Sequence, residues 1–285
     1  MNKCFKLIHD SQENWAKQKH LKLKYVEEEA YTLSLAPNLY YPTLSTSTID
    51  EYLAGKGNEF KGHMKALCSS SALVVNVFEY WKQKGRVSDI LQVFGEYSDE
   101  KEMFFEKTHA ILRWGTPPHL DIEFCGGSKR PLAIESKFAE PYRSKTTQRN
   151  DTNLKQYLDE NDIWRGLAKL KNLARDVHQE EKTKTSWPYL DVPQLIKHIL
   201  GLTKAYKPKG FTLLYLWFDC KTEESSGHRA DIKKFNDKIK GEVHFKSLSY
   251  QELFNKIQAI PNVDPNYTKY LKERYEVVPE FWTGC

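Results

Sequence analysis

Cysteine is scarce in this chain of 285 residues, and its distribution excludes several classes of protein. The five cysteines are an odd number, they are widely separated, and none belongs to a CxxC pair. Such spacing argues against a disulfide framework and against a structural zinc site. No apolar run approaches the roughly 20 residues that a membrane helix requires, and the first residues contain no apolar core of a signal peptide. We therefore expect a cytoplasmic protein in a reducing environment, without a membrane partner.

Internal repeats, low-complexity tracts and linker segments are also missing, which favours a single domain. With 40% hydrophobic and 13% aromatic residues, the chain can bury a core and does not have a disordered composition. The net charge is only +5, because 38 acidic residues offset 43 lysines and arginines. A surface for a polyanion therefore requires clustered basic residues. Residues 1–60 show no clear pattern, and we assign them to a segment packed on a domain at 61–285.

The order of periodic segments predicts an α/β fold with a mixed central sheet flanked by helices. The segments expected to be helical are 49–53, 72–85, 87–94, 153–177, 193–205, 230–240, 250–257 and 266–275. The expected strands are 102–108, continuing through 110–114, then 119–124, 132–138, 211–219 and 243–245. The continuous apolar run at 211–219 is typical of a central strand covered on both faces. The crossover helix before it places this strand parallel to the 132–138 strand.

Two short strand patterns joined by a Gly-rich turn contain the most informative residues. Apolar residues alternate with polar ones in the segments HLDIEF and LAIESKF. Side chains two residues apart in a strand share a face. A hairpin turn at the intervening CGGS would therefore bring Asp121, Glu135 and Lys137 together above a buried apolar layer.

Two carboxylates and a lysine in this arrangement are typical of a metal-dependent phosphodiesterase. Magnesium takes oxygen ligands and keeps several waters, so it can activate a nucleophile and stabilise charge at a phosphate. Asp121 and Glu135 would supply carboxylate oxygens, and Ser136 would supply its main-chain carbonyl. Lys137 would orient or help to deprotonate the attacking water, or stabilise the developing charge. We expect Mg²⁺ as the cofactor, with Mn²⁺ able to replace it.

The same residues resemble those of a known group of enzymes. Asp121, followed 14 residues later by Glu135-Ser136-Lys137, resembles the pattern of the PD-(D/E)xK nuclease superfamily, which includes most type II restriction enzymes. The segments SSSALVVNVF, FFEK, PPHLDIEF, IESKFAEPY and QLIKHILGL occur in this order between residues 65 and 257. They are similar to those of a bacterial family of restriction endonuclease-like proteins. The resemblance implies a restriction-endonuclease-like core, with metal ligands at Asp121 and Glu135 and a water-assisting Lys137.

The resemblance also implies roles for residues outside this motif. Glu106, in FFEK, matches an acid of the family pattern and would be an outer or second-metal ligand, although a solvated strand residue fits equally. Gln194 and His198 share a helix face and resemble polar helix residues that flank such sites; the alternative is a polar helix flank. We include Glu106 and Gln194 among the predicted catalytic residues. Glu140 also matches the pattern, but it leaves the Glu135 face and is expected to serve structurally.

Basic residues after the predicted site are candidates for contacts with DNA phosphates. Arg143, Lys145 and Arg149 follow the motif directly, and we predict that they bind nucleic acid. Further basic residues lie along the next expected helix: Lys155, Arg165, Lys169, Lys171 and Arg175. A solvated helix with interspersed acids explains the latter equally well. Double-stranded DNA is the expected partner, and palindromic sites would call for a homodimer.

The sequence favours a Mg²⁺-dependent endonuclease that hydrolyses DNA in restriction or another defence role. The alternative is a catalytically silent nucleic-acid-binding or assembly module with the same fold, whose DNA affinity would depend on salt. A two-carboxylate glycoside hydrolase, with Asp121 or Glu123 paired with Glu135, is disfavoured by the neighbouring lysine and by the lack of an aromatic sugar platform. A zinc cluster of His119, Asp121 and Cys125 has no fourth ligand nearby.

Overall fold

A computed structural model describes residues 2–27, 29–55, 59–60, 62–95, 102–127, 130–143, 154–180 and 187–277. The α-helices are α1 (Lys3–Gln18), α2 (Thr46–Ala54), α3 (Ser70–Gln83), α4 (Val87–Val93), α5 (Lys155–Leu158), α6 (Ala168–Glu180), α7 (Val192–Tyr206), α8 (Glu223–Ile239), α9 (Tyr250–Gln258) and α10 (Pro265–Tyr275). The strands are β1 (Leu23–Val26), β2 (Glu29–Thr32), β3 (Glu102–Thr108), β4 (His119–Cys125), β5 (Leu132–Lys137), β6 (Thr212–Trp217) and β7 (His244–Ser249). Four 3₁₀ helices also occur in these ranges: η1 (Ala36–Asn38), η2 (His63–Lys65), η3 (Glu140–Tyr142) and η4 (Asp162–Trp164).

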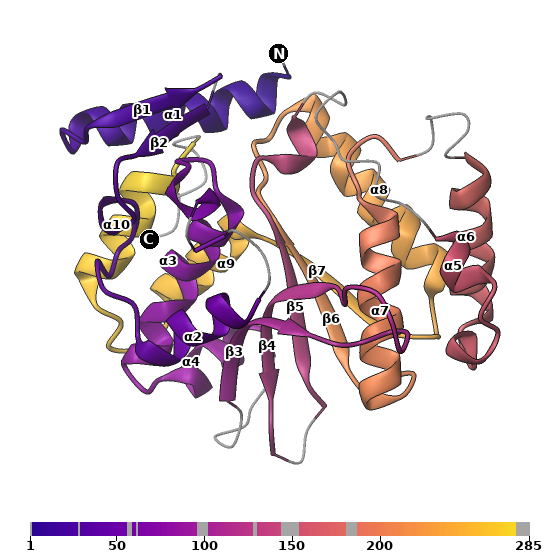
Figure 1. Cartoon of the computed structure of the whole chain (residues 1–285). Helices are drawn as coiled ribbons and strands as arrows, with labels where there is room; N and C mark the ends of the chain where they lie inside the picture. Colours follow the sequence, from indigo (N-terminus) through magenta and orange to yellow (C-terminus); the bar gives the residue numbers. More distant parts are fainter. Residues whose placement is uncertain are drawn as a thin grey trace.

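The centre of the molecule is a five-stranded sheet in the order β3-β4-β5-β6-β7. β3, β4 and β5 are antiparallel neighbours, whereas β5, β6 and β7 run parallel. Helices α2, α3, α4, α9 and α10 lie on one side of the sheet, and α6, α7 and α8 lie on the other (Figure 1). This is the α/β fold of a restriction-endonuclease-like core that the sequence predicted. The predicted neighbours of β5 are also confirmed, with β4 antiparallel and β6 parallel to it.

Strand β6 is buried along its whole length because helices cover both of its faces. Leu214 and Leu216 belong to the apolar cluster that includes residues of α3, α9 and α10. Leu213, Tyr215 and Trp217 alternate with them and belong to the opposite cluster, together with residues of α6, α7 and α8. The uninterrupted apolar pattern of this strand follows from its two covered faces.

The first 60 residues differ most from the expectation, because they contain an unpredicted helix, α1, and a separate two-stranded sheet of β1 and β2. Asn2 caps α1 by accepting from the N–H groups of Cys4 and Phe5. Cys4 and Ile8, one turn apart, belong to the same apolar cluster as residues of α3, α9 and α10. The structure also contains a disulfide between Cys4 and Cys220. The cysteine spacing argued against a disulfide framework, and this single pair spans 216 residues, a separation that no local pattern reveals.

Several predicted boundaries need correction. The helix expected at 153–177 is divided into α5, η4 and α6, and Gly166 between the last two has a φ of +78° that favours glycine. The strand expected to continue through 110–114 is irregular, because Ile111 packs among residues of α7 instead of pairing in the sheet. Helix α8 begins earlier than expected, since Thr222 and Ser225 form a capping box at its start.

A buried histidine links α8 to the sheet. Tyr142 donates to the carbonyl of Phe218 at 2.8 Å, so its oxygen must accept from Nδ1–H of His228, 3.0 Å away. Nε2 of His228 then accepts from the hydroxyl of Tyr215, also at 3.0 Å. Burial, together with the nearby charge of Lys137, lowers the pKa of His228 to about 3. The imidazole is therefore neutral in the folded protein.

This histidine predicts a loss of stability in acid. Between pH 6.5 and 3 the unfolded chain binds a proton that folded His228 does not bind. The free energy of unfolding should then fall with decreasing pH, with a contribution from this group of up to about 1.4 kcal/mol per pH unit. Urea unfolding at a series of pH values measures the slope. His228→Gln should flatten it in this range, whereas the exposed control His20→Asn should not; equal slopes in the two variants would contradict the prediction.

Candidate active site

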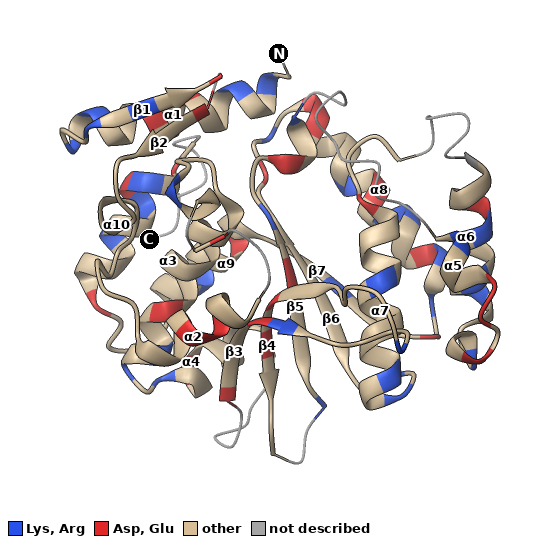
Figure 2. Ribbon diagram, in the orientation of Figure 1, with Lys and Arg blue, Asp and Glu red and all other residues tan. Residues whose placement is uncertain are grey.

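The antiparallel pairing of β4 and β5 brings the predicted acidic residues to one end of the sheet. The regular pairs of these strands end at Ile122 and Ile134. Beyond them, the backbone N–H of Ser136 donates to Oδ2 of Asp121 at 2.7 Å. The carboxylate of Asp121 thus lies directly beside the peptide that joins Glu135 to Ser136. Figure 2 shows acidic residues on β4 and β5 in the middle of the molecule.

Glu135 is buried between the ammonium group of Lys137 and the imidazole of His198. Its Oε1 accepts from Nζ of Lys137 at 2.6 Å, and its Oε2 lies 2.9 Å from Nε2 of His198 on α7. The imidazole has ion-pair distance to this oxygen but not the alignment of a hydrogen bond, and its Nδ1 has no hydrogen-bond partner among the described residues. The side chain of Glu135 is only 2% exposed, whereas that of Lys137 keeps 15% exposure. Solvent therefore reaches the site from the lysine side.

The two carboxylates have opposite protonation tendencies. Burial and the neighbouring charge of Glu135 raise the pKa of Asp121 well above its usual value, although Lys137 opposes this effect. Burial would also raise the pKa of Glu135, but the charges of Lys137 and His198 outweigh it and lower this pKa to about 2. The pKa of Lys137 is raised despite burial, because Glu135 and Asp121 both stabilise its charged form. The ammonium group of Lys137 thus interacts with both acids.

Glu106 lies at the position of β3 opposite Asp121, between two regular cross-strand pairs. Its φ of +51° is in the left-handed region, which a side chain other than glycine rarely adopts. Oε2 of Glu106 is 3.3 Å from Nδ1 of His119, and the glutamate side chain is 10% exposed. Burial raises the pKa of Glu106, and His119 partly offsets the increase. The structure therefore brings this predicted acid to the edge of the site and holds it in a strained backbone conformation.

Other predicted residues lie outside this group. The N–H of Gln194 donates to the cap residue Asp191, and its side chain makes no hydrogen bond to the three motif residues within the described part of the chain. Glu140, the first residue of η3, accepts from the N–H of Phe138 at 2.9 Å, a local contact.

The predicted nucleic-acid-binding residues are only partly described. Arg143 is paired with Glu29 of β2, and its guanidinium lies 5.6 Å from the ring centre of Phe5. Lys145 and Arg149 lie outside the described residues. Basic residues are spread over α6, α7 and α8, and acidic ones lie among those of α6 and α8 (Figure 2). Those of α6 make local contacts: Lys169 with the carbonyl of Lys240, Lys171 with Asn161, and Arg175 with Asn172.

Two groups of polar contacts near the site were not predicted. The hydroxyl of Tyr250, at the start of α9, lies 2.6 Å from Oγ of Ser136. Glu123, two residues after Asp121 on β4, is fully buried and is contacted by His109 and Tyr206. These partners are 14 to 114 residues apart in sequence, so no spacing pattern identifies them.

One protein family covers almost the whole chain. The model of the family described as "restriction endonuclease associating with ARP" matches residues 9–276. The chain belongs to this REase-ARP family. The match includes β3, β4, β5 and α7, which together carry the candidate site. No curated protein and no solved structure matches this REase-ARP chain. Within the described ranges, none of its helices is long and apolar enough to cross a membrane.

The donor atoms of the REase-ARP site suit magnesium better than zinc. No cluster of three or more His, Cys, Asp or Glu side chains that could hold a metal occurs in the described segments, and structural zinc requires four such ligands. Mg²⁺ binds proteins through one or two carboxylates and keeps several waters. Asp121, Glu135 and the main-chain carbonyl of Ser136 match that requirement. Burial and the neighbouring charge of Glu135 raise the pKa of Asp121, and a bound cation would offset both effects.

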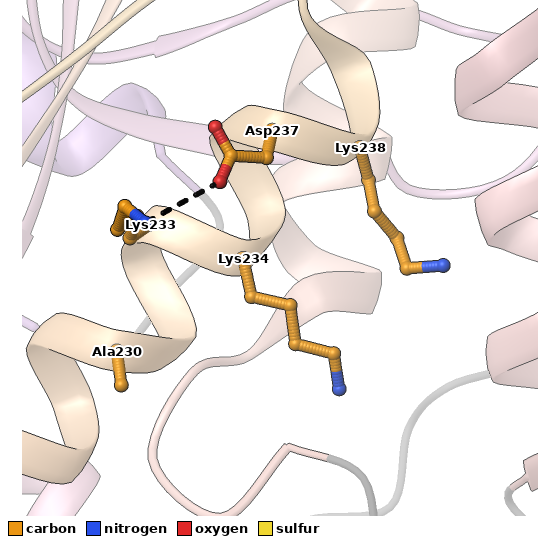
Figure 3. A pocket seen from close by; sticks show the side chains of 5 residues that line it. All are labelled: Ala230, Lys233, Lys234, Asp237 and Lys238. Carbon is orange, nitrogen blue, oxygen red and sulfur yellow. Dashed lines mark ion pairs between the residues drawn. The ribbon is translucent and has the colours of Figure 1, made fainter.

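A separate hollow of the REase-ARP chain lies on the outer side of α8 (Figure 3). It has a volume of about 460 Å³ and is lined by Ala230, Lys233, Lys234, Asp237 and Lys238. Its lysines have partners on the protein: Lys233 lies 3.9 Å from Asp237, Lys234 is over the ring of Trp187, and Lys238 lies 3.7 Å from Asp176. None of the predicted catalytic residues lines this hollow.

Proposed function

We propose that this REase-ARP protein is a Mg²⁺-dependent endonuclease that hydrolyses DNA phosphodiester bonds in restriction or another defence role. The observation that carries the proposal is the convergence of Asp121, Glu135 and Lys137 at one end of the sheet, in the arrangement of the PD-(D/E)xK motif. Membership of a restriction endonuclease family supports the same reaction class. The protein would act in the cytoplasm on double-stranded DNA, as a homodimer where the site is palindromic. We also propose that this chain associates with ARP, as the description of its family states.

In this proposal each residue of the motif has one task. Asp121, Glu135 and the carbonyl of Ser136 would hold Mg²⁺ (or Mn²⁺), which supplies Lewis-acid polarisation of the phosphate and a more acidic water. The raised pKa of Lys137 keeps its ammonium protonated. Lys137 therefore donates a hydrogen bond to the attacking water or to a phosphate oxygen and stabilises negative charge, rather than removing a proton. Glu106 would bind outer-shell water beside Asp121.

A DNA cleavage assay with Mg²⁺, with Mn²⁺ and with EDTA tests the proposal. The wild-type protein should cut plasmid DNA with either metal and not in EDTA, and Glu102→Gln, an exposed acid on β3, should behave as wild type. Binding of DNA without cleavage would instead support the catalytically silent module. Cleavage that is unchanged after substitution of all three motif residues would overturn the assignment.

Metal binding should also be visible without activity. Mg²⁺ at about ten times its dissociation constant should stabilise the folded protein by roughly 1.4 kcal/mol, a shift of about 2–4 °C in the midpoint of thermal unfolding for a chain of this size. Differential scanning fluorimetry with and without Mg²⁺ measures this shift. Glu135→Gln should lose it and Glu102→Gln should keep it. An equal shift in both variants would place the bound metal elsewhere.

A further inference from the structure

The connection between β3 and β4, residues 109–118, leaves the sheet at the end that carries the candidate site. We refer to it as the strap. β3 ends opposite the start of β4, and β4 is antiparallel to β5, so the strap emerges where β5 ends at Lys137. From there it reaches α7, the helix that also supplies His198 (Figure 1).

Contacts with α7 and β4 fix the base of the strap. Nζ of Lys204 donates to the carbonyl of Ile111 at 2.9 Å. A Cβ atom added to Gly201 would lie 2.7 Å from the carbonyl oxygen of His109, so the two backbones approach as closely as only glycine permits. Nε2 of His109 lies 2.5 Å from Oε2 of the buried Glu123. The base of the strap is thus attached to two rigid elements.

The tip of the strap has the opposite character. Arg113 and Trp114 are exposed, and neither makes a hydrogen bond or ion pair with any part of the chain that the structure describes. Trp114 is 59% exposed, the highest value among the exposed large hydrophobic side chains of the described residues. Gly115, with a φ of +89° and open space around it, completes the turn.

An exposed indole beside a cation on a fixed base has the chemistry that recognises nucleic acid. Aromatic side chains stack on the faces of bases, and an arginine next to them binds the backbone phosphates. Inside an intact duplex the base faces are covered by their neighbours, so a stacking residue requires unpaired bases or an opened base step. The strap joins β3 to β4 beside the motif, and its base contacts the C-terminal half of α7, so this contact would lie to one side of the motif.

We propose that Arg113 and Trp114 bind DNA containing unpaired bases, with Trp114 stacked on a base and Arg113 on an adjacent phosphate. This inference rests on the proposed function and adds a substrate preference to it. The preferred substrate class is a duplex with a single-stranded bubble or gap rather than a continuous duplex.

The test compares the binding of two fluorescently labelled DNAs, a duplex and the same duplex with a short unpaired bubble, by anisotropy in EDTA. Trp114→Ala should weaken binding of the bubble DNA about tenfold, within the range measured for base–aromatic stacking, and should change duplex binding much less. Trp114→Phe should retain the preference for the bubble. Arg113→Ala should weaken binding of both DNAs. It should also reduce the slope of log affinity against log salt concentration by about one, the value expected for the loss of one phosphate contact.

A matched control is available in Tyr25, an aromatic residue of β1 with 56% exposure. Tyr25→Ala should leave both affinities unchanged, and circular dichroism should give the same spectrum for every variant. Equal binding of both DNAs by Trp114→Ala and wild type would overturn the inference, as would a wild-type protein that binds neither DNA. Because the assay needs no cleavage, loss of the bubble preference with normal Mg²⁺-dependent cleavage would refute the strap contact and leave the nuclease assignment intact.

Discussion

Asp121→Asn is expected to abolish Mg²⁺-dependent DNA cleavage while making the folded protein more stable. In the proposed function Asp121 binds the metal, so its loss should lower the rate by about a thousandfold or more, since both the charge and the position of the cation would depend on it. The amide oxygen of asparagine can still accept the hydrogen bond from the N–H of Ser136. The local backbone should therefore keep its conformation, and the defect should be chemical rather than structural.

The gain in stability follows from the raised pKa of Asp121. Burial and Glu135 make the charged form of Asp121 less favourable in the folded than in the unfolded protein. Below the pKa of Asp121 in the unfolded chain, this group does not affect stability. As the pH rises from that pKa to the higher pKa of the folded protein, the free energy of unfolding falls, and above the folded pKa the loss stays constant. Asparagine removes the penalty, so the variant should be more stable than wild type at pH 7 and equal to it in strong acid.

Cleavage assays and urea unfolding at several pH values measure the two effects separately. Glu102→Gln, which removes an exposed acid from β3, is the control and should change neither property. A variant that is both inactive and less stable at pH 7 would contradict the prediction, because Asp121 would then have a structural role.

Lys137→Met should eliminate cleavage and also destabilise the protein. Without the ammonium, the buried Glu135 keeps only the imidazole of His198 beside its carboxylate. Removing one partner of a buried pair typically costs about 3–5 kcal/mol, and part of this cost should appear as a rise in the pKa of Glu135. The rate of cleavage should fall by about a hundredfold or more, as it does when a charge-stabilising donor is lost.

A second substitution separates the two consequences of losing the lysine. In Lys137→Met combined with Glu135→Gln, the charge of Glu135 is removed together with its ammonium partner, so much of the lost stability should return while cleavage stays absent. Chemical unfolding of the two single variants and the double variant gives the coupling energy. Lys24→Met, an exposed strand lysine, is the control. If the loss of unfolding free energy in the double variant equalled the sum of the losses in the two single variants, the pairing of Lys137 with Glu135 would not explain the instability of Lys137→Met.

The proximity of Asp121, Glu135 and Lys137 was predictable because it depends on local rules. Alternation within two adjacent strands assigns all three side chains to one face, and a short turn makes the strands antiparallel neighbours. The buried central position of β6 followed from its continuous apolar run in the same way. Each of these inferences uses residues that are close together in sequence.

Contacts between distant segments could not be predicted in this way. The pairing of Ser136 with Tyr250 spans 114 residues, and the disulfide between Cys4 and Cys220 spans 216. Helix α1 was missed because its buried residues are few and lie among lysines and glutamines, although Cys4, Ile8 and Trp15 recur at helical spacing. The strained conformation of Glu106 likewise depends on its surroundings, because propensity alone would not place a glutamate at positive φ.

Because side chains alternate along β5, this strand contacts the helices on both sides of the sheet. Glu135 and Lys137 project toward the α7 layer, whereas Ser136, between them, projects the other way and meets the hydroxyl of Tyr250 on α9. A ligand or protein that displaced α9 by a fraction of an ångström would act on Ser136, the one residue between the acid and the lysine. The helical layer opposite α7 is thus connected to the strand of the candidate site through a hydrogen bond between two hydroxyl groups.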